Sequence, residues 1–433
     1  MPPATSKPPK PPERARISNV KRRVWLPDDV IDLIFETMVT DPTLDWSVSF
    51  KFRDIKVFVE ALRMHQPCNY LLVCRQWTNV ILNNRSLWTT ILVDPWSIQD
   101  HGFEPIYAKV KAHIKHSGNR PLNAVFICGV ISYSSRSDTA MNQREDQLEL
   151  LRLLAGKTGQ VAARWRTCIV AWQGTVRSRR TENLSLTFPM PQLTSLCIWG
   201  WPSGAFPTDC FATTPALRHI SGGSSTIKAW SGHTFSELIT LEMSNRVLDS
   251  PFTVLPCLQS VTILKLVVPP SRSEELSFIG QRRLYDIEQV SLPKVVEFAV
   301  HGVANAEFLS KFKLEGLRSL SFRLETTLVA ESDPLLAAVE KFASPKIVKL
   351  DLSIDQPWAD RDKLVDLTGW TINFLETLPN VEKVTGTSHF LRVILNAKKR
   401  KGWILPLAEI SPPVPKRKPR RRKARHRVVT SSD

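Results

Sequence analysis

The first run of apolar side chains with helical spacing follows Pro27. From here to Asp41-Pro42, apolar residues recur at steps of three and four, which predicts an amphipathic helix. Pro27 suits the first turn because its missing N–H needs no partner there, and Asp41-Pro42 predicts the end of the helix. The apolar positions are Val30, Ile31, Ile34 and Met38.

A second helix is predicted from Tyr70 to the Asn83-Asn84 pair, followed by a turn and a strand over residues 85–91. The intervening segment, residues 42–68, is ambiguous, although Pro67 closes any helix within it. In the second helix the apolar stripe consists of Val73, Trp77, Val80 and Ile81. In the ambiguous segment a helix would place on one face Phe52, Ile55, Val59 and Leu62.

From about residue 115 the apolar pattern changes to i, i+3 and i+5, the kernel of a leucine-rich repeat. First positions lie 24, 21, 20, 37, 22, 30 and 34 residues apart, and four of these spacings fall in the usual range of about 20–29. The kernels are Leu193/Leu196/Ile198, Leu217/Ile220, Leu238/Leu241/Met243, Leu258/Val261/Ile263, Val295/Phe298/Val300, Leu317/Leu320/Phe322, Ile347/Leu350/Leu352 and Val381/Val384. Candidates for earlier, more divergent copies are Leu122/Val125/Ile127 and Trp165/Cys168/Val170.

Such repeats cannot bury their apolar faces singly, so they stack into a solenoid with parallel strands on its concave side. Helical patterns at 144–156, 333–344 and 361–380 fit between the strands. The Asn of the usual repeat ladder is missing, so we expect a degenerate leucine-rich repeat. The alternative is an ordinary α/β domain with periodic strands, which would need longer helical crossovers than 20–24 residues allow.

Three motifs of the N-terminal stretch, with a fourth that follows it, resemble one family. "LPDDVIDLIF", "LLVCRQW" and "SLW", followed by "KHSGNRPLNAVFI" at Lys115–Ile127, are similar to the F-box proteins of mushroom-type fungi. In that family the motifs read "LPxE(I/V)", "LxxVCrrW", "LW" and "RSGxRPL". Here Asp28-Asp29 replaces the usual Pro/Glu pair, and the connection between the helices is longer by about twenty residues, which identifies residues 42–68 as an insertion.

The resemblance implies docking onto the Skp-family adaptor of a cullin–RING ubiquitin ligase. A helical module this small does not bury its own apolar residues well and usually needs a partner. Leu26 and Pro27 are expected at the interface, Trp77 mainly in the module's core, and a helix within residues 42–68 would be able to cover the docking face. The residues that would divide between core and adaptor groove are Leu26, Pro27, Ile31, Ile34, Val73, Trp77, Ile81, Leu87 and Trp88. The alternative is that all nine are internal core.

Charge and composition narrow the classes of function. The net charge is +17, but residues 1–25 carry +6, residues 398–401 carry +4 and residues 411–433 carry +8, which leaves about −1 for the body. A nucleic-acid-binding domain would instead carry a basic stripe on a folded face. No apolar run approaches the roughly 18 residues of a membrane span, and the N-terminus has no apolar core of a secretory signal.

The basic ends are expected to be disordered because they are rich in Pro, Lys and Arg. The C-terminal run indicates a nuclear-localisation signal, and the alternative is a solubilising tail. We therefore expect the protein in the nucleus, the cytoplasm or both. The signal residues are Lys416, Arg417, Lys418, Arg420, Arg421, Arg422 and Lys423.

A search for catalytic motifs is negative, since GxGxxG, GxxxxGK[ST], HExxH and GxSxG are all missing. The seven cysteines include no CxxC pair and suit free thiols in a reducing compartment. His113 and His116 would lie at i, i+3 on a helix, but no third metal ligand accompanies them. We predict a protein that is not an enzyme and that needs no metal or cofactor.

The sequence therefore predicts an α/β chain with four parts: a disordered tail at 1–23, an F-box-like helical module at 24–92, a degenerate leucine-rich-repeat domain at 93–396 and a disordered tail at 397–433. The hypothesis is a substrate receptor that holds an unknown protein substrate near the charged ubiquitin. The competing hypothesis is a nuclear scaffold or chromatin-associated protein that binds nucleic acid through its basic tails only. An enzyme of unknown class comes last.

Overall fold

The structure is a computed structural model, and it describes residues 26–39, 55–129, 138–173, 187–199, 213–223, 235–244, 255, 259–268, 288–302, 306–325, 332–355 and 370–386. Both predicted tails, the signal at 416–423 and the helix end at Asp41-Pro42 lie outside the described residues. The domain boundaries stay predictions.

The N-terminal stretch is helical, as predicted. α1 (Asp28–Val39) is followed by α2 (Ile55–Met64), the 3-10 turn η2 (Pro67–Tyr70), α3 (Arg75–Asn83) and η3 (Arg85–Trp88). Two acidic residues, Asp28 and Asp29, occupy the first turn of α1, where the positive end of the helix dipole favours them.

The second predicted helix begins five residues later than expected. Cys74 has an extended backbone, with φ −161° and ψ 165°, so it interrupts the helical conformation between η2 and α3. Val73 therefore lies in a turn and not on the apolar stripe of α3. The end of the helix is confirmed, because Asn84 is its C-cap and donates its backbone N–H to Val80.

The helical region has its own small core. Phe35 of α1 packs edge-on against Trp77, with ring centroids 5.0 Å apart, and also contacts Tyr70. The indole of Trp88 donates a hydrogen bond to the Ile81 carbonyl at 2.8 Å. The fully buried members of this core are Ile31, Phe35, Val80, Ile81, Leu87 and Trp88.

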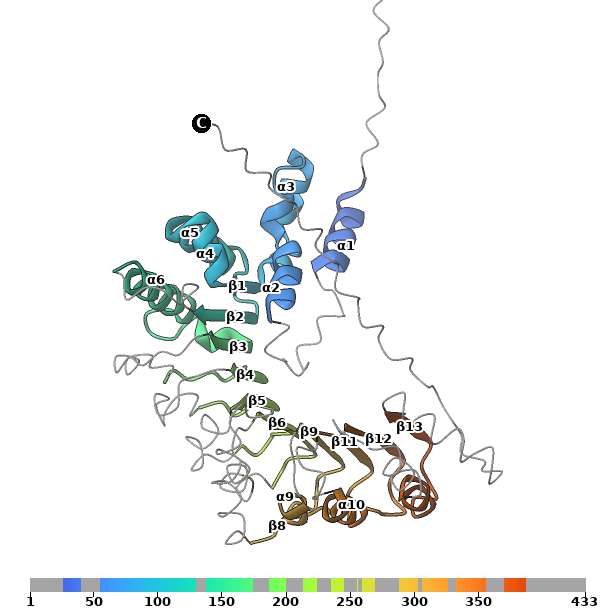
Figure 1. The fold of residues 1–433 in the computed structure, drawn as a ribbon. Coiled ribbons are helices and arrows are strands. Elements are labelled where there is room, and N and C mark those ends of the chain that lie inside the picture. The colour runs from blue at the N-terminus through green and yellow to red at the C-terminus, as the bar shows by residue number, and fades with distance from the viewer. Residues whose placement is uncertain are drawn as a thin grey trace, which may run out of the picture.

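The rest of the described chain is built on one eleven-stranded parallel sheet (Figure 1). Each strand pairs with the next strand of the sheet along the chain, so the strands follow one another along a curved stack. A sheet with this strand order and short crossovers is a solenoid, and the predicted fold class is confirmed. The strands are β1 (Thr90–Val93), β2 (Leu122–Gly129), β3 (Trp165–Gln173), β4 (Ser195–Trp199), β5 (His219–Gly223), β6 (Thr240–Ser244), β7 (Ile263–Val268), β9 (Glu297–Gly302), β11 (Ser319–Glu325), β12 (Lys349–Asp355) and β13 (Lys383–Gly386).

The main core lies between one face of this sheet and the segments that return between strands. These segments carry the helical patterns of the sequence. Of the pattern at 361–380, residues 370–380 are described and residues 370–376 are helical. The returning elements are α4 (Pro95–His101), α5 (Phe103–His116), α6 (Asp138–Ala155), η4 (Ala162–Arg164), α9 (Ala306–Ser310), α10 (Ser332–Glu340) and a small two-stranded parallel pair of β8 (Val290–Ser291) with β10 (Phe312–Lys313).

Strand register tests the repeat kernels directly. Leu196, Ile220 and Leu241 are partners across β4, β5 and β6, and all three are buried in the main core. The divergent copy Trp165/Cys168/Val170 is confirmed, because Cys168 and Val170 pair with Leu196 and Ile198.

Two predicted kernels are wrong in register. Leu241 pairs with Leu264, so the fourth kernel is Val261/Leu264/Leu266 and not Leu258/Val261/Ile263. Two overlapping i, i+3, i+5 patterns exist there, and only pairing with β6 selects one of them. In β2 the core positions are Leu122, Ala124 and Phe126, whereas Val125 and Ile127 face the other side of the sheet. The two sets alternate along β2, and the extra residue of the i, i+3 step lies in β3, where Leu122 pairs with Trp165 but Asn123 pairs with Thr167.

Candidate docking surface and binding cavity

α1 carries a second apolar face that stays at least partly exposed among the described residues. Ile31 and Phe35 point into the helical core, whereas Val30, Leu33 and Ile34 are exposed, Leu33 to 65%. Steps of three and four residues place these last three on one side of the helix. Leu26, at the start of α1, extends this face and is also exposed.

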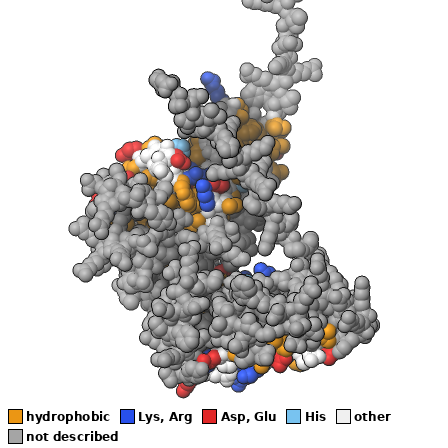
Figure 2. All heavy atoms as spheres, in the orientation of Figure 1, with side chains coloured by type: hydrophobic (Ala, Val, Ile, Leu, Met, Phe, Trp, Pro, Cys, Tyr) orange, Lys and Arg blue, Asp and Glu red, His pale blue; other side chains and the backbone are white. Residues whose placement is uncertain are grey.

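The turn before α3 adds two more exposed side chains, Leu72 at 97% and Val73 at 56%. The amide of Gln76 donates to the Leu26 carbonyl at 2.7 Å and to the Asp28 carboxylate at 2.8 Å. These bonds place the turn at the same end as the start of α1. We call Leu26, Val30, Leu33, Ile34, Leu72 and Val73 the docking surface. Figure 2 shows hydrophobic side chains gathered around α1.

The nine residues predicted to divide between core and adaptor groove lie in three environments. Trp77 is half-buried against the helical core. Those that are fully buried are Ile31, Ile81, Leu87 and Trp88. Those that are exposed are Leu26, Pro27, Ile34 and Val73. In this conformation only the exposed group and the edge of Trp77 can meet a partner, and adaptor binding itself stays a prediction.

Three members of the docking surface were missed by sequence reasoning: Val30, Leu33 and Leu72. Leu33 breaks the single stripe expected of an amphipathic helix, and this was the available signal. A helix that is apolar on two sides needs a second packing partner. Leu72 adjoins Val73, and its exposure follows from the extended Cys74.

His113 and His116 pack around Trp88. Their rings lie 5.0 and 4.8 Å from the Trp88 ring, and Nδ1 of His113 lies 3.3 Å from the Trp88 carbonyl oxygen. Burial, helped by the nearby charge of Lys109, lowers the pKa of His113 to about 3. Within the described residues no group of three or more His, Cys, Asp or Glu side chains could hold a metal ion.

The described part of the insertion does not cover the docking surface. α2 buries Ile55, Val59 and Leu62 against the face of the sheet opposite the main core. Figure 1 shows α2 beside β1, on the inner side of the curve. The sheet residues beneath it are Leu92, Val125, Ile127, Ile169, Ala171 and Cys197. Residues 42–54 lie outside the described part of the chain.

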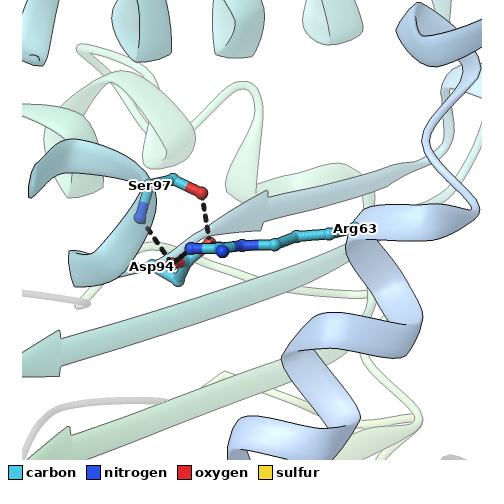
Figure 3. Close-up of polar contacts among 3 residues, drawn as sticks. All are labelled: Arg63, Asp94 and Ser97. Carbon is cyan, nitrogen blue, oxygen red and sulfur yellow. Dashed lines mark hydrogen bonds and ion pairs between the residues drawn. The ribbon is translucent and has the colours of Figure 1, made fainter. Parts of the chain in front are cut away.

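An ion pair between the partly exposed Arg63 and the buried Asp94 fastens α2 to the first repeat (Figure 3). Arg63, in the last turn of α2, pairs with both carboxylate oxygens of Asp94, which is fully buried. Asp94 is also the N-cap of α4 and accepts from the Ser97 backbone N–H and hydroxyl, each at 2.8 Å. Because these four donors satisfy its oxygens, the buried carboxylate is a stable anchor.

Beyond α2 the same face of the sheet becomes polar. A cavity of about 340 Å³ lies over β6 to β13. Its floor is made by the side chains that alternate with the core positions, a consequence of the two-residue strand period. The ionisable residues that line it are Glu242, Lys265, Glu297, His301, Lys349, Asp351 and Lys383.

A hydrogen-bonded network runs across the cavity from β9 to β12. Asp351 accepts two bonds from Arg323, at 2.9 and 2.7 Å, and one from the Ser321 hydroxyl at 3.2 Å. His301 Nε2 lies 3.3 Å from the same hydroxyl. In a Ser-His-Asp triad the carboxylate accepts a hydrogen bond from the histidine, whereas here the Asp351 carboxylate accepts one from the Ser321 hydroxyl. The network therefore has a different order from that of a hydrolase.

Comparison with known proteins does not assign the chain to a family. No family model matches the sequence, and no curated protein matches it. One similar solved chain belongs to the yeast Rad7–Elc1 complex, with a TM-score of 0.38 and 10% identity over 83% of this chain and 88% of that chain. Another, a Bacteroides fragilis protein, has a TM-score of 0.29 and 8% identity over 61% and 83%. Similarity this low identifies neither a family nor a partner.

No helix in the described segments is both long enough and apolar enough to cross a membrane.

Proposed function

We propose that this chain is a non-catalytic substrate receptor, the F-box subunit of a cullin–RING ubiquitin ligase. Its docking surface would bind the Skp-family adaptor, and its repeat domain would bind a protein substrate. The observation that carries this proposal is the second apolar face of α1, which leaves Leu33 65% exposed beside a helical core that is already complete.

Burial of this face would supply the binding energy. Fully burying a leucine or valine side chain is worth roughly 1.5–3 kcal/mol, and a few such anchors carry most of the affinity of an interface. Leu33, Leu72 and Val73 are the most exposed apolar side chains of the surface. They can become buried without changing the packing of Ile31 or Trp88.

The arrangement also suits a receptor because its two surfaces are separate. The docking surface lies on α1 and the turn before α3, whereas the cavity lies over β6 to β13. α2 and the Arg63–Asp94 pair join the helical region to the sheet. A substrate held in the cavity would therefore keep one orientation relative to the adaptor, which raises the effective concentration of its lysines near the ubiquitin-charged enzyme.

Co-purification with a Skp-family adaptor tests the proposal. Leu33→Asp combined with Val73→Asp should abolish co-purification, because both charges would have to be buried in the interface. Leu26→Ala combined with Pro27→Ala should weaken it. Circular dichroism should be unchanged, since these side chains are exposed.

The matched control is Val57→Asp. Val57 is 66% exposed on α2, outside the docking surface, so this variant should co-purify like the unchanged chain. Equal recovery of the adaptor with Leu33→Asp/Val73→Asp and with Val57→Asp would refute the docking assignment.

A further inference from the structure

Charge is divided unequally along the rim of the solenoid at which the strands begin. No Asp or Glu occurs in the described segments that enter β1 to β5, which are residues 84–89, 115–121, 156–166, 187–194 and 213–218. Their basic residues are Arg85, Lys115, Arg120, Lys157, Arg164, Arg166 and Arg218. In the segments that enter β6 to β13, residues 235–239, 259–262, 292–296, 314–318, 343–348 and 377–382, the charges balance as Glu237, Glu315 and Glu382 against Lys294, Arg318 and Lys346. A body that is close to neutral therefore has a basic rim at its first five strands.

Two of these arginines hold equivalent positions in their repeats. Arg166 and Arg218 each follow the first core residue of a kernel, and Thr194 does so in the repeat between them. The Thr194 N–H and hydroxyl donate to the Arg166 carbonyl at 2.8 and 3.0 Å, and the Arg218 N–H donates to the Thr194 carbonyl at 2.9 Å. The backbones of the two arginines are therefore two strand steps apart, roughly 10 Å.

Strand irregularity turns Arg166 out of the ladder. Arg166 is the extra residue of β3, because Leu122 pairs with Trp165 whereas Asn123 pairs with Thr167. Extra residues of this kind are common next to functional sites, where they re-aim a side chain. The Arg166 side chain is exposed.

Arg120, on the segment that enters β2, is tied to β3 by another arginine. Arg164 donates to the Arg120 carbonyl at 3.1 and 2.9 Å and to the Ser117 hydroxyl at 2.7 Å. These bonds occupy the Arg164 guanidinium and fix the turn that carries Arg120. Within the described residues the side chains of Arg120, Arg166 and Arg218 are exposed and make no hydrogen bond or ion pair. We call these three residues the arginine row.

Acidic side chains limit the arginine row at both ends. One end borders a cavity of about 570 Å³ whose charged lining residues are Asp28, Asp32, Arg85 and Arg120. At the other end Glu237 follows, in the segment that enters β6. The row spans three strand steps between β2 and β5, roughly 14 Å. A matching anionic ligand is therefore short.

We propose that the arginine row binds a protein segment that carries two phosphate groups, on side chains three residues apart. Three residues of extended chain span roughly 10 Å, which matches the separation of Arg166 and Arg218. Arg120 can share the first phosphate with Arg166, since they enter adjacent strands. A guanidinium with unused donors binds phosphate through two parallel hydrogen bonds, a geometry that a lysine amine does not offer.

A nucleic acid fits this rim less well. Single strands are bound largely by stacking on aromatic rings, and in the five described segments that enter β1 to β5 the aromatic side chains of Trp88, Trp165 and Phe188 are buried or half-buried. A long polyanion would also meet the carboxylates at both ends of the row. Two phosphates on a short peptide segment avoid them.

The arginine row adjoins the cavity that is proposed to hold the substrate. The row ends at β5 and the cavity begins at β6, so one substrate chain can occupy both. As a description of a ligase substrate the inference rests on the proposed receptor function, whereas peptide binding is measured on the chain alone.

Fluorescence anisotropy with the full-length chain tests the inference. The probe is a fluorescein-labelled peptide of Gly and Ala that carries two phosphoserines three residues apart. Arg166→Glu combined with Arg218→Glu should lower its affinity at least about tenfold, because two charge-assisted contacts are replaced by repulsion. Arg166→Lys combined with Arg218→Lys keeps the charge, loses the paired donors and should lower the affinity about threefold or more. This second variant serves if charge reversal unfolds the chain.

The matched control lies on the same rim, in its balanced half. Arg318 also follows the first core residue of its kernel, and Lys294 enters β9. Arg318→Glu combined with Lys294→Glu removes the same charge from exposed positions and should leave the affinity within about twofold. The basic ends of the chain are present in every variant, so their contribution to binding is the same. A peptide with glutamate in place of both phosphoserines should bind the unchanged chain at least about fivefold more weakly.

Equal affinities of the Arg166→Glu/Arg218→Glu and control variants would overturn the inference. So would equal binding of the glutamate peptide, or a short single-stranded DNA that binds more than tenfold more tightly and depends on the same arginines. Loss of adaptor co-purification with phosphopeptide binding intact would count against the receptor function alone.

Discussion

His113 shows how one buried polar side chain joins two parts of the molecule. It lies on α5, in the crossover between β1 and β2, and packs edge-on against Trp88 of the helical region. Its Nδ1 faces the Trp88 carbonyl, while its Nε2 is buried without a hydrogen-bond partner in the described structure. Protonation would bury a charge there, so the folded chain keeps this ring neutral.

This predicts that stability falls as the solution is acidified. The pKa of His113 is about 3 in the folded chain and near 6.5 when unfolded. Below pH 6.5 the unfolded chain binds a proton at His113 that the folded chain does not bind. The contribution of His113 to the free energy of unfolding is therefore complete above pH 6.5 and is lost progressively as the pH falls toward 3. His113→Gln should therefore reduce the slope of unfolding free energy against pH in this window, by up to about 1.4 kcal/mol per pH unit.

Urea unfolding at a series of pH values measures this slope. His116→Gln is the control, since it removes the ring on the other side of Trp88 and leaves His113 in place. If the slopes of the His113→Gln and unchanged chains coincide between pH 6.5 and 4, the buried neutral state is wrong.

Among the elements, α2 has the most consequence for function. Its apolar residues fill the inner face of the first four strands, and its last turn pairs with Asp94. The helix thereby fastens the helical region to the solenoid and covers the inner face over these strands.

Leu62→Ala should therefore destabilise the chain by about 2–4 kcal/mol, because it leaves a cavity between α2 and the sheet. Val57→Ala, on the exposed side of the same helix, should stay within about 0.5 kcal/mol. Hydrogen exchange of the α2 and β2 amides, combined with denaturant unfolding, distinguishes the two. Similar protection of these amides in the two variants would mean that α2 does not pack on the sheet.

For the whole molecule, the position of the charge along the chain determines which part can bind nucleic acid. The net charge of +17 lies almost entirely in the terminal segments, and the body is close to neutral. Any binding to duplex DNA should therefore be unspecific, weaken steeply with salt and depend on residues 411–433, with a log–log salt slope of about −0.9 per phosphate contacted.

Fluorescence titration of a 20-base-pair duplex at several salt concentrations measures this dependence. Deleting residues 411–433 should flatten the slope, because nine Lys and Arg residues are removed. Lys349→Glu should leave it unchanged, since a duplex does not fit a cavity of about 340 Å³. A slope that the deletion leaves unchanged would contradict the competing hypothesis, in which nucleic acid is bound through the basic tails only.

The local spacing of apolar residues was sufficient to predict the type of most helices and strands and their order along the chain. Steps of three and four residues predicted α1, and the i, i+3, i+5 kernels predicted most strands of the sheet, because both patterns follow from the geometry of one helix or one strand. Trp165/Cys168/Val170 was recognised in this way despite containing no leucine.

What the chain's own pattern left open was settled by contacts between distant segments. Pairing with β6 places Leu264, and not Ile263, in the core. A shift of one residue in strand register would turn every side chain of the strand to the other face of the sheet. Burial against the sheet decided that α2 fills the inner face of the solenoid. The exposed apolar face of α1 could be identified only from the packing of α3 against the other face of this helix. Apolar spacing alone does not show which apolar face is covered.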